Sequence, residues 1–264
     1  MNIFEAVFFG VLQGVTEFLP VSSSGHLAIS KILLGQGDVP ILFDVLLHMA
    51  TLFVVLIVFR QKVARLILSL GKLFAKEKSD ETKNEHRTIL SIIIATVLTG
   101  AIGVFIEQLN IQEAPKVVSS LFIVTGILLF LPRFISVKER GEPGVRSGII
   151  VGIAQGFGVL PGISRSGITI TASILSGLSR ERAGEYAFLI SVPAILGALV
   201  LELKDGLELT TQVGVAAISA GIIAAFAAGF ISLLLLLRFI KGGKLHYFSF
   251  YLIPLGILGL VFIR

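Results

Sequence analysis

The sequence has 264 residues, of which 55% are hydrophobic and only 15% are charged, and its mean hydropathy is +0.95. Its apolar runs are too long and too many for the core of a soluble protein of this length. The formal net charge is +5, but the basic residues stand in short loops beside apolar segments, which indicates membrane topology rather than nucleic-acid binding. Cysteine is absent, which excludes disulfides, thiolate catalysis and cysteine metal sites.

The first apolar region, about 2–34, is interrupted halfway by a cluster of Pro, Ser and Gly. Each half is mostly too short to cross a bilayer, which takes roughly 20 apolar residues. The region lacks a charged start and contains Glu5, Gln13 and Glu17, so we do not interpret it as a signal peptide. A second interrupted region, about 147–177, has the same character. We expect both to be re-entrant helical hairpins, because broken helices at membrane depth are tolerated only inside protein or beside a watery cavity.

Further along the chain, six segments are long and apolar enough to span a membrane. They lie near 41–59, 89–106, 117–131, 186–203, 213–237 and 245–263. The loop 60–87 holds the densest run of basic residues and is expected on the cytoplasmic side. Following the spans from there places both termini outside the cytoplasm. The amphipathic piece from Val63 to Lys76 is expected along the inner surface. The predicted fold is all-α, a multi-pass protein of the plasma membrane.

The chain also contains an internal repeat. Shifting it by 142 positions aligns 10–35 with 152–177 without a gap, and nine of the 26 pairs are identical, against about two or three expected by chance. Each copy is then one broken hairpin and three spans, with repeat one at about 1–135 and repeat two at about 144–264 of a single membrane domain. Because three spans are an odd number, we expect an inverted-topology repeat whose hairpin tips meet near the midplane.

The positions that differ between the copies carry the chemistry. The first hairpin has Glu17, Ser23 and His26 where the second has Val159, Arg165 and Ile168. One tip therefore offers a carboxylate, hydroxyls and an imidazole, and the other offers a guanidinium. A shared site would combine a nucleophile, a proton carrier and an anion clamp. This indicates phosphate chemistry, because arginine grips phosphate oxygens in two places and helix starts present free N–H groups to anions.

Several charged residues allow two interpretations. An arginine within a membrane is a functional hypothesis by default, but the alternative for Arg165 is a structural ion pair with Glu17. Glu17 itself has two candidate roles, holding His26 or ligating a hard divalent cation that bridges the phosphates. Asp44 and His48 are four positions apart on one helix face, where they either form a polar edge of the cavity or pair with each other.

The serines also allow two interpretations. Ser22 and Ser24 recur in the second copy as Ser164 and Ser166, and helix capping explains them as well as phosphate binding does. Ser23 is the serine that the repeat replaces. It is therefore the expected nucleophile, with His26 about one helical turn away as its base. Attack by water, again with His26 as base, is the variant that the sequence leaves open.

These motifs resemble those of a known family. QGVTEFLPVSSSGH at 13–26 and PGISRSGIT at 161–169 resemble the two signatures of the undecaprenyl-diphosphate phosphatases of the bacitracin-resistance type, and FDVLLHMATL at 43–52 is similar to their third span. The resemblance covers essentially the whole chain. It implies hydrolysis of the terminal phosphate of a polyprenyl diphosphate to the monophosphate carrier that is recycled for cell-wall glycan assembly. It also implies a site that opens outside the cytoplasm and depends on a divalent cation, Mg²⁺ or Ca²⁺.

The resemblance assigns a role to each motif residue. Glu17 matches a motif carboxylate, Ser23 the nucleophile, His26 the acid/base and Arg165 the phosphate-binding arginine. Further polar motif positions are matched by Ser22, Ser164, Ser166 and Thr169. We expect these four residues and Ser24 to bind phosphate. One departure is Gln13, which stands where the family often has glutamate. Since an amide offers a carbonyl oxygen but no charge, the part of Gln13 as a metal ligand beside Glu17 stays open.

The alternative function is a transporter or flippase of an anionic lipid or anion, since inverted repeats with broken helices are also a transporter architecture. The asymmetric set of Glu17, Ser23 and His26 favours the phosphatase, because a carrier has little use for a serine beside a base. A second lipid-phosphatase family shares only Ser24-Gly25-His26 with this chain, and its remaining motif residues are missing. The expected partners are the lipid substrate and membrane lipids, and the Gly/Ala-rich spans suit a homodimer as well as packing within one chain.

Overall fold

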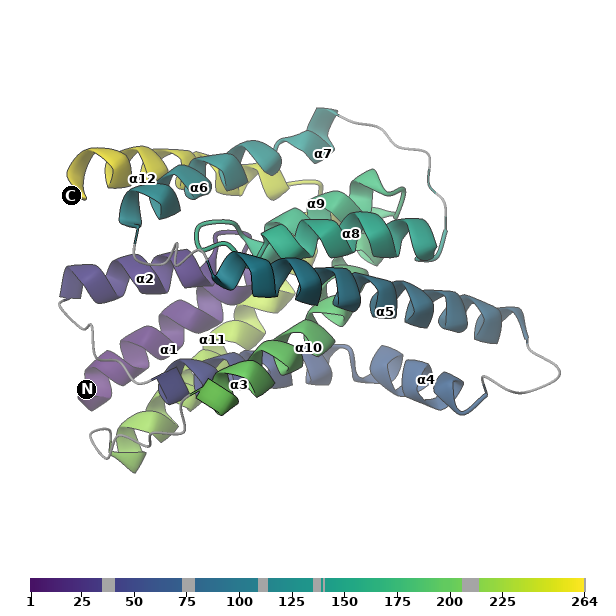
Figure 1. Cartoon of the computed structure of the whole chain (residues 1–264), viewed down its shortest axis with the longest axis horizontal. Coiled ribbons are helices and arrows are strands. Elements are labelled where there is room, and N and C mark those ends of the chain that lie inside the picture. The colour runs from purple at the N-terminus through teal and green to yellow at the C-terminus, as the bar shows by residue number, and fades with distance from the viewer. Residues whose placement is uncertain are drawn as a thin grey trace.

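The computed structural model describes residues 1–34, 41–72, 79–108, 114–134, 139, 141–205 and 214–263. Within these ranges the chain is helical and contains no strand (Figure 1). The elements are α1 (Ile3–Phe18), α2 (Ser23–Leu34), α3 (Ile41–Val58), α4 (Arg60–Leu70), α5 (Asp80–Glu107), α6 (Pro115–Leu128), α7 (Leu131–Phe134), α8 (Val145–Phe157), α9 (Arg165–Leu175), α10 (Arg180–Asp205), α11 (Val215–Lys241), the 3₁₀ helix η2 (Leu245–Phe248) and α12 (Ser249–Phe262). The prediction of an all-α fold is confirmed.

Five of the six expected membrane-spanning segments are also confirmed. In the part of the chain that the structure describes, five helices are long and apolar enough to cross a membrane: Asp80–Ile106, Pro115–Phe134, Arg180–Val200, Val215–Lys241 and Leu245–Phe262. A sixth span results if Leu42–Val58 and Arg60–Leu70, which meet at an angle of 81°, are counted together. The protein is therefore a multi-pass membrane protein. The amphipathic piece that starts at Val63 overlaps α4, its residues 73–76 lie outside the described ranges, and its position along the membrane surface stays a prediction.

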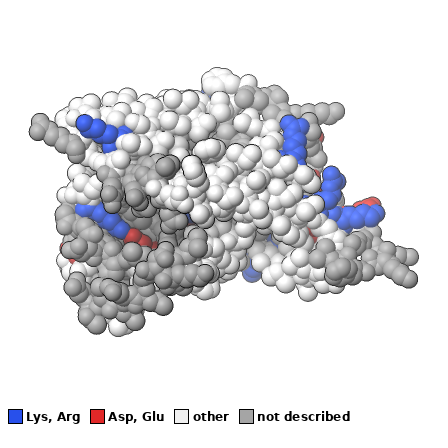
Figure 2. Space-filling model, in the orientation of Figure 1, with Lys and Arg blue, Asp and Glu red and all other residues white. Residues whose placement is uncertain are grey.

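The outer surface of the bundle is apolar between two charged ends. Figure 2 shows Lys and Arg side chains gathered toward the two ends of the longest axis, with uncharged atoms between them. Large apolar side chains are exposed along the long helices, including Val97, Ile223 and Phe250. A soluble monomer rarely exposes so much contiguous apolar surface. In a membrane this surface would be covered by lipid tails. Both chain termini lie at the same end of the molecule (Figure 1).

Each half of the chain packs its first helix on a long helix of the other half. A Cβ atom at Gly10 of α1 would lie 2.3 Å from the carbonyl oxygen of Gly221 on α11. A Cβ atom at Gly152 of α8 would lie 2.6 Å from the Cα atom of Ala95 on α5. Small residues allow such close approach of helix backbones in membranes. Gly10 and Gly152 are equivalent positions in the repeat, and both pack closely on a long helix of the other half, as expected for two copies of one unit. The inverted topology of the repeat stays a prediction.

The two interrupted regions are pairs of short helices whose breaks meet at the centre of the molecule (Figure 1). The backbone N–H of Gly162, in the break between α8 and α9, donates to Oγ of Ser22 in the other break, over 3.0 Å. Gly162 has a φ of +100°, and a Cβ atom there would lie 2.4 Å from the carbonyl oxygen of Val118. A Cβ atom at Gly25 would lie 2.9 Å from the nitrogen of Gly162. The breaks therefore meet as expected, and re-entry of the helix pairs into the membrane stays a prediction.

Candidate active site

Glu17 is the centre of the polar cluster at this junction. It lies in the last turn of α1, and its side chain is only 6% exposed. Its Oε1 atom accepts a hydrogen bond from Nη2 of Arg165 over 2.5 Å, and its Oε2 atom accepts one from Oγ of Ser23 over 2.6 Å. The carboxylate, the hydroxyl and the guanidinium of the two hairpins are therefore in direct contact. Burial of a charged pair is expensive unless both ions are hydrogen-bonded, and here both are.

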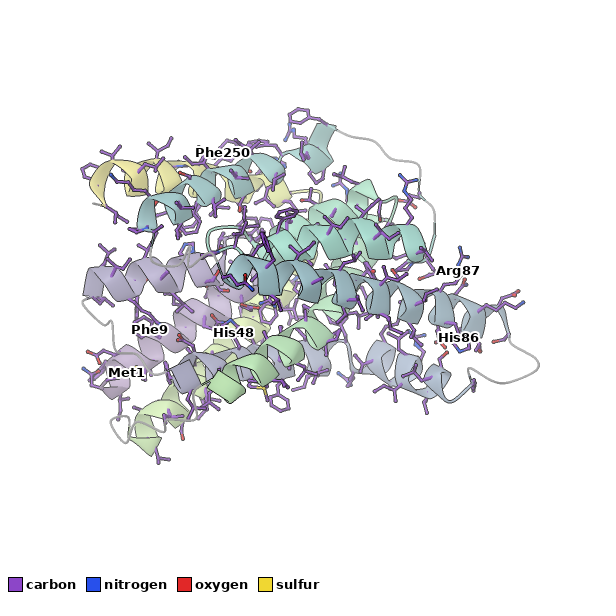
Figure 3. All side chains as sticks on the ribbon, viewed as in Figure 1. Met1, Phe9, His48, His86, Arg87 and Phe250 are labelled. Atoms are coloured by element: carbon purple, nitrogen blue, oxygen red, sulfur yellow. The ribbon has the colours of Figure 1, made fainter. Side chains whose placement is uncertain are left out.

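The same carboxylate faces two further polar side chains. Nε2 of Gln13, one turn earlier in α1, donates to Oε2 of Glu17 over 3.1 Å. Nε2 of His48 on α3 lies 3.8 Å from this oxygen, near the centre of the molecule in Figure 3. Nδ1 of His48 donates to the backbone carbonyl of Asp44 over 2.9 Å, while the carboxylate of Asp44 pairs with Lys31. The side chains of Asp44 and His48 therefore do not pair with each other, and His48 is a polar edge of the site.

His26 has different neighbours from those expected. Its Nδ1 atom donates to the backbone carbonyl of Ser22 over 2.8 Å, and its Nε2 atom lies 2.8 Å from the hydroxyl of Tyr251 on α12. The His26 and Tyr251 rings are stacked, with an angle of 13° between their planes. The expected contact between Ser23 and His26 is absent here, because Ser23 donates to Glu17 and both ring nitrogens of His26 are engaged. Glu17 likewise faces His48 and does not hold His26.

Two of the motif serines connect backbone groups. Oγ of Ser22 accepts hydrogen bonds from the backbone N–H of Gly25, over 3.4 Å, and from that of Gly162 in the opposite break. The backbone of Ser22 has a left-handed φ of +71°. Oγ of Ser164 accepts from the backbone N–H of Gly167 over 3.1 Å and caps α9. Both serines are almost fully buried. The capping interpretation therefore describes their present contacts.

The other hydroxyls lie near the starts of α9 and α2. Thr169 donates to the backbone carbonyl of Arg165 over 2.7 Å, and Ser166 donates to that of Leu19 over 3.4 Å. Ser24 is exposed, with its Oγ atom 3.5 Å from that of Ser22. These hydroxyls are held by weak or local bonds, so they can turn toward a ligand without breaking the helices.

A pocket opens beside the ion pair of Glu17 and Arg165. Its polar lining also includes Ser166 and Thr169 of α9, Thr51 of α3 and Ser191 of α10, and its apolar lining includes Phe18, Val55, Phe188 and Ile195. Sequence reasoning had not identified Thr51 and Ser191. Each donates to a carbonyl of its own helix, so neither carries a local signal that distinguishes it from an ordinary helical hydroxyl. The pocket therefore combines an anion clamp with apolar walls.

The comparisons with known proteins identify the family. The family profile described as "Bacitracin resistance protein BacA" matches residues 6–258. The chain belongs to the BacA family. It is 46% identical over 258 residues to the "Undecaprenyl-diphosphatase" of Treponema denticola, covering 97% of this chain and 96% of that protein. The protein of the same name from Borrelia recurrentis is 42% identical over 255 residues, covering 96% of each chain, and that of Alkaliphilus metalliredigens is 39% identical over 273 residues, covering 99% of each.

The site of this BacA-family chain offers few ligands for a cation. Among the described residues, no group of three or more His, Cys, Asp or Glu side chains is arranged to hold a metal. The two expected ligands, Glu17 and Gln13, are nevertheless adjacent, and Oε1 of the buried Gln13 has no hydrogen-bond partner. One carboxylate and one unpaired amide oxygen suit a hard cation that takes its remaining ligands from phosphate and water. The residues present therefore fit a cation that binds together with a phosphorylated substrate.

Proposed function

We propose that this chain is a membrane phosphatase that hydrolyses undecaprenyl diphosphate to the monophosphate carrier lipid. The names of its relatives support the substrate, since full-length matches at 39–46% identity are undecaprenyl-diphosphatases. The observation that carries the proposal is the contact of Ser23 and Arg165 with opposite oxygens of one buried carboxylate, Glu17. It brings a nucleophile and an anion clamp into contact with one proton acceptor, and Glu17 and Arg165 line the pocket.

The residues that line the pocket match the chemistry of the two ends of such a lipid. Arg165 and the start of α9 would bind the diphosphate, because a guanidinium fork and a helix N-terminus both favour phosphate oxygens. The serines and Thr169 around Arg165 would complete this binding. The apolar side chains of α3 and α10 would contact the first part of the prenyl chain. On binding, Arg165 exchanges part of its contact with Glu17 for phosphate oxygens, which leaves that carboxylate free to accept a proton.

The hydrogen bond between Ser23 and Glu17 favours attack by serine. Oγ of Ser23 forms a bond to the outer phosphorus, the bond from this phosphorus to the bridging oxygen breaks, and the monophosphate lipid leaves with the electron pair. The hydroxyl proton moves to Oε2 of Glu17, 2.6 Å away. Water then attacks the phosphorus of the phosphoserine, and the bond from this phosphorus to Oγ of Ser23 breaks. Oγ takes back the proton held by Glu17, and the two protons of the water leave with inorganic phosphate as H₂PO₄⁻. Arg165 stabilises the charge on the phosphoryl oxygens in both steps.

Two finer assignments belong to the same proposal. For His26 to serve as the acid/base, its Nε2 atom would have to exchange the Tyr251 hydroxyl for a phosphate oxygen. A bound Mg²⁺ or Ca²⁺, held by Glu17 and Gln13, would supply positive charge to the diphosphate.

We also propose that the termini and the mouth of the site face away from the cytoplasm. Support comes from the basic residues of the first large loop. Arg87, the last residue of that loop, lies at the end of the molecule opposite Met1 (Figure 3). Cytoplasmic loops carry an excess of Lys and Arg.

The test is phosphate release from undecaprenyl diphosphate by the purified full-length protein in detergent. Wild type is compared with Ser23→Ala and Arg165→Ala, each with Mg²⁺, with Ca²⁺ and with EDTA. The matched controls are Ser120→Ala and Arg60→Ala, because both side chains are exposed and each donates to a backbone carbonyl three or four positions earlier in the chain. We expect release by wild type and both controls, and a loss of two or more orders of magnitude in the site variants.

The same preparation separates the phosphatase from a flippase of anionic lipids. If folded wild-type protein releases no phosphate with any divalent ion, but moves the lipid between the leaflets of a vesicle, the phosphatase proposal is wrong. If both controls lose activity as strongly as the site variants, the site is placed wrongly.

A further inference from the structure

His48 lies beside the two candidate cation ligands although it comes from a different helix. Its Nε2 atom is 3.8 Å from Oε2 of Glu17, which is too long for a hydrogen bond. Two ligand bonds of about 2.0–2.2 Å each can together span up to about 4.4 Å, so one ion between these two atoms can contact both. We propose that His48 is a ligand of the divalent cation, together with Glu17 and Gln13, an inference that rests on the proposed function of this site.

The orientation of the His48 ring suits this role. Nδ1 donates to the backbone carbonyl of Asp44 over 2.9 Å, and a carbonyl can only accept, so Nδ1 carries the proton. In the neutral ring the lone pair is then on Nε2, which is the nitrogen that faces Glu17. Metal-binding histidines usually donate their other N–H to a carbonyl or carboxylate in this way, which fixes the ring and its tautomer. α3 therefore presents a preoriented nitrogen donor to the site.

Gln13 provides independent support. Its side chain is completely buried, and its Nε2 atom donates to Oε2 of Glu17. Its Oε1 atom has no hydrogen-bond partner among the residues that the structure describes. Buried polar atoms without a partner are rare in folded proteins and call for an explanation. A rotation of the Gln13 amide by half a turn would exchange the places of Nε2 and Oε1 and bring Oε1 toward the carboxylate of Glu17. A cation between them would then bind two oxygens that otherwise repel each other.

The resulting set of donors has a preference among ions. It consists of one carboxylate oxygen, one amide oxygen and one imidazole nitrogen, so it carries a single negative charge. Imidazole favours first-row transition ions, whereas Mg²⁺ and Ca²⁺ prefer sites built only from oxygen. We therefore expect this chain to bind Mn²⁺ and Zn²⁺ more tightly than Mg²⁺. His48 would supply the third donor where Gln13 replaces a carboxylate.

The test uses Mn²⁺ as the probe and inorganic pyrophosphate in place of the lipid head group. Full-length protein in detergent is stripped with EDTA, and Mn²⁺ binding is followed by electron paramagnetic resonance. The modulation of the electron spin echo then reports whether a nitrogen atom is bonded to the ion. A histidine with a purely structural role would not produce this modulation. We expect ¹⁴N coupling in wild type, loss of this coupling in His48→Gln, and an affinity for Mn²⁺ that is lower by about tenfold or more.

The control variant is His86→Gln. His86 is bonded to the backbone carbonyl of Ser69, near the end of the molecule opposite Met1 (Figure 3), so its replacement should leave the signal unchanged. If His48→Gln does not fold, wild-type protein labelled with [¹⁵N]histidine tests whether a histidine nitrogen is bonded to the ion. The modulation must then change from that of ¹⁴N to that of ¹⁵N. His26→Gln must then retain the coupling.

Two outcomes overturn the inference: wild-type protein that binds Mn²⁺ without nitrogen coupling, or coupling that persists in folded His48→Gln. Phosphate release is measured on the same samples. Release without nitrogen coupling contradicts the role of His48 and leaves the phosphatase intact. Nitrogen coupling without release in any ion contradicts the phosphatase and leaves the metal site.

Discussion

Oγ of Ser23 lies 2.6 Å from Oε2 of Glu17, so the expected nucleophile shares its proton with a buried carboxylate and not with a histidine. The carboxylate is the last polar group of α1, and the hydroxyl is in the first turn of α2. The sharp break between these helices brings them together. Activation of Ser23 is therefore a property of the first helix pair alone, while Arg165 of the second pair supplies the positive charge.

Glu17→Gln should reduce phosphate release more than His26→Gln does. Glutamine keeps the shape of the side chain but cannot accept the proton of Ser23, and a positioned general base contributes about 10²–10⁴ in rate. Initial rates of phosphate release and the amount of acid-quenched phosphoserine measure this directly. A loss in His26→Gln as large as that in Glu17→Gln would contradict the role of Glu17 as base and return it to His26.

Arg165→Lys should be folded but nearly inactive, with phosphate release lower by about 10²-fold or more. Lysine keeps the positive charge beside Glu17 but lacks the planar fork that binds two phosphate oxygens. Arg165→Ala should in addition lose about 3–5 kcal/mol of stability, because it leaves the carboxylate buried without its partner. Thermal unfolding in detergent tests this, with Glu17→Gln added to Arg165→Ala as the control.

The double variant should regain stability without regaining activity, since it removes the unpaired charge but not the need for a phosphate clamp. If Arg165→Ala alone unfolds at the wild-type temperature, the ion pair carries no structural energy. If Arg165→Lys retains full activity, the fork is not required for binding the diphosphate.

The sequence predicted much of this site because its signals were local. Serine-rich breaks in two apolar regions, together with the repeat that relates them, were enough to place Glu17, Ser23 and Arg165 at one junction. The prediction needed only that the two breaks meet. No detailed packing of the long helices was required for it.

The neighbours contributed by other helices could not be predicted in the same way. Ser191 reaches the site only because α10 packs beside it, and no pattern around this residue indicates that. For His48, the spacing from Asp44 left a polar edge of the cavity and a pair with Asp44 equally open. The partner of His26 is Tyr251, which is 225 positions away. Whether Ser23 turns toward His26 or Glu17 depends on side-chain rotamers, which the spacing of residues along a helix leaves undetermined.

Gln13→Glu should increase the affinity for Mg²⁺. It places a second carboxylate one helical turn from Glu17, which adds a charged oxygen ligand of the kind that hard cations prefer. Without a cation the two carboxylates repel each other, so the temperature of unfolding should fall in EDTA and recover when Mg²⁺ is added. Phosphate release and thermal unfolding across a Mg²⁺ titration measure both effects. A Mg²⁺ dependence identical to that of wild type would show that position 13 does not contact the ion.

Gly162→Ala should destabilise the junction of the two breaks and reduce phosphate release with it. Gly162 has a φ of +100°, and its Cβ atom would lie 2.4 Å from the carbonyl oxygen of Val118, so the backbone must shift. Backbone strain of this kind amounts to roughly 1–3 kcal/mol, to which the clash adds. Gly100→Ala is the matched control, because no heavy atom lies within 4 Å of a Cβ atom there and alanine in a helix is favoured by about 0.5–1 kcal/mol. Unfolding temperatures in detergent should therefore move in opposite directions. Wild-type stability together with wild-type activity in Gly162→Ala would mean that the breaks do not meet as closely as the backbone of Gly162 requires.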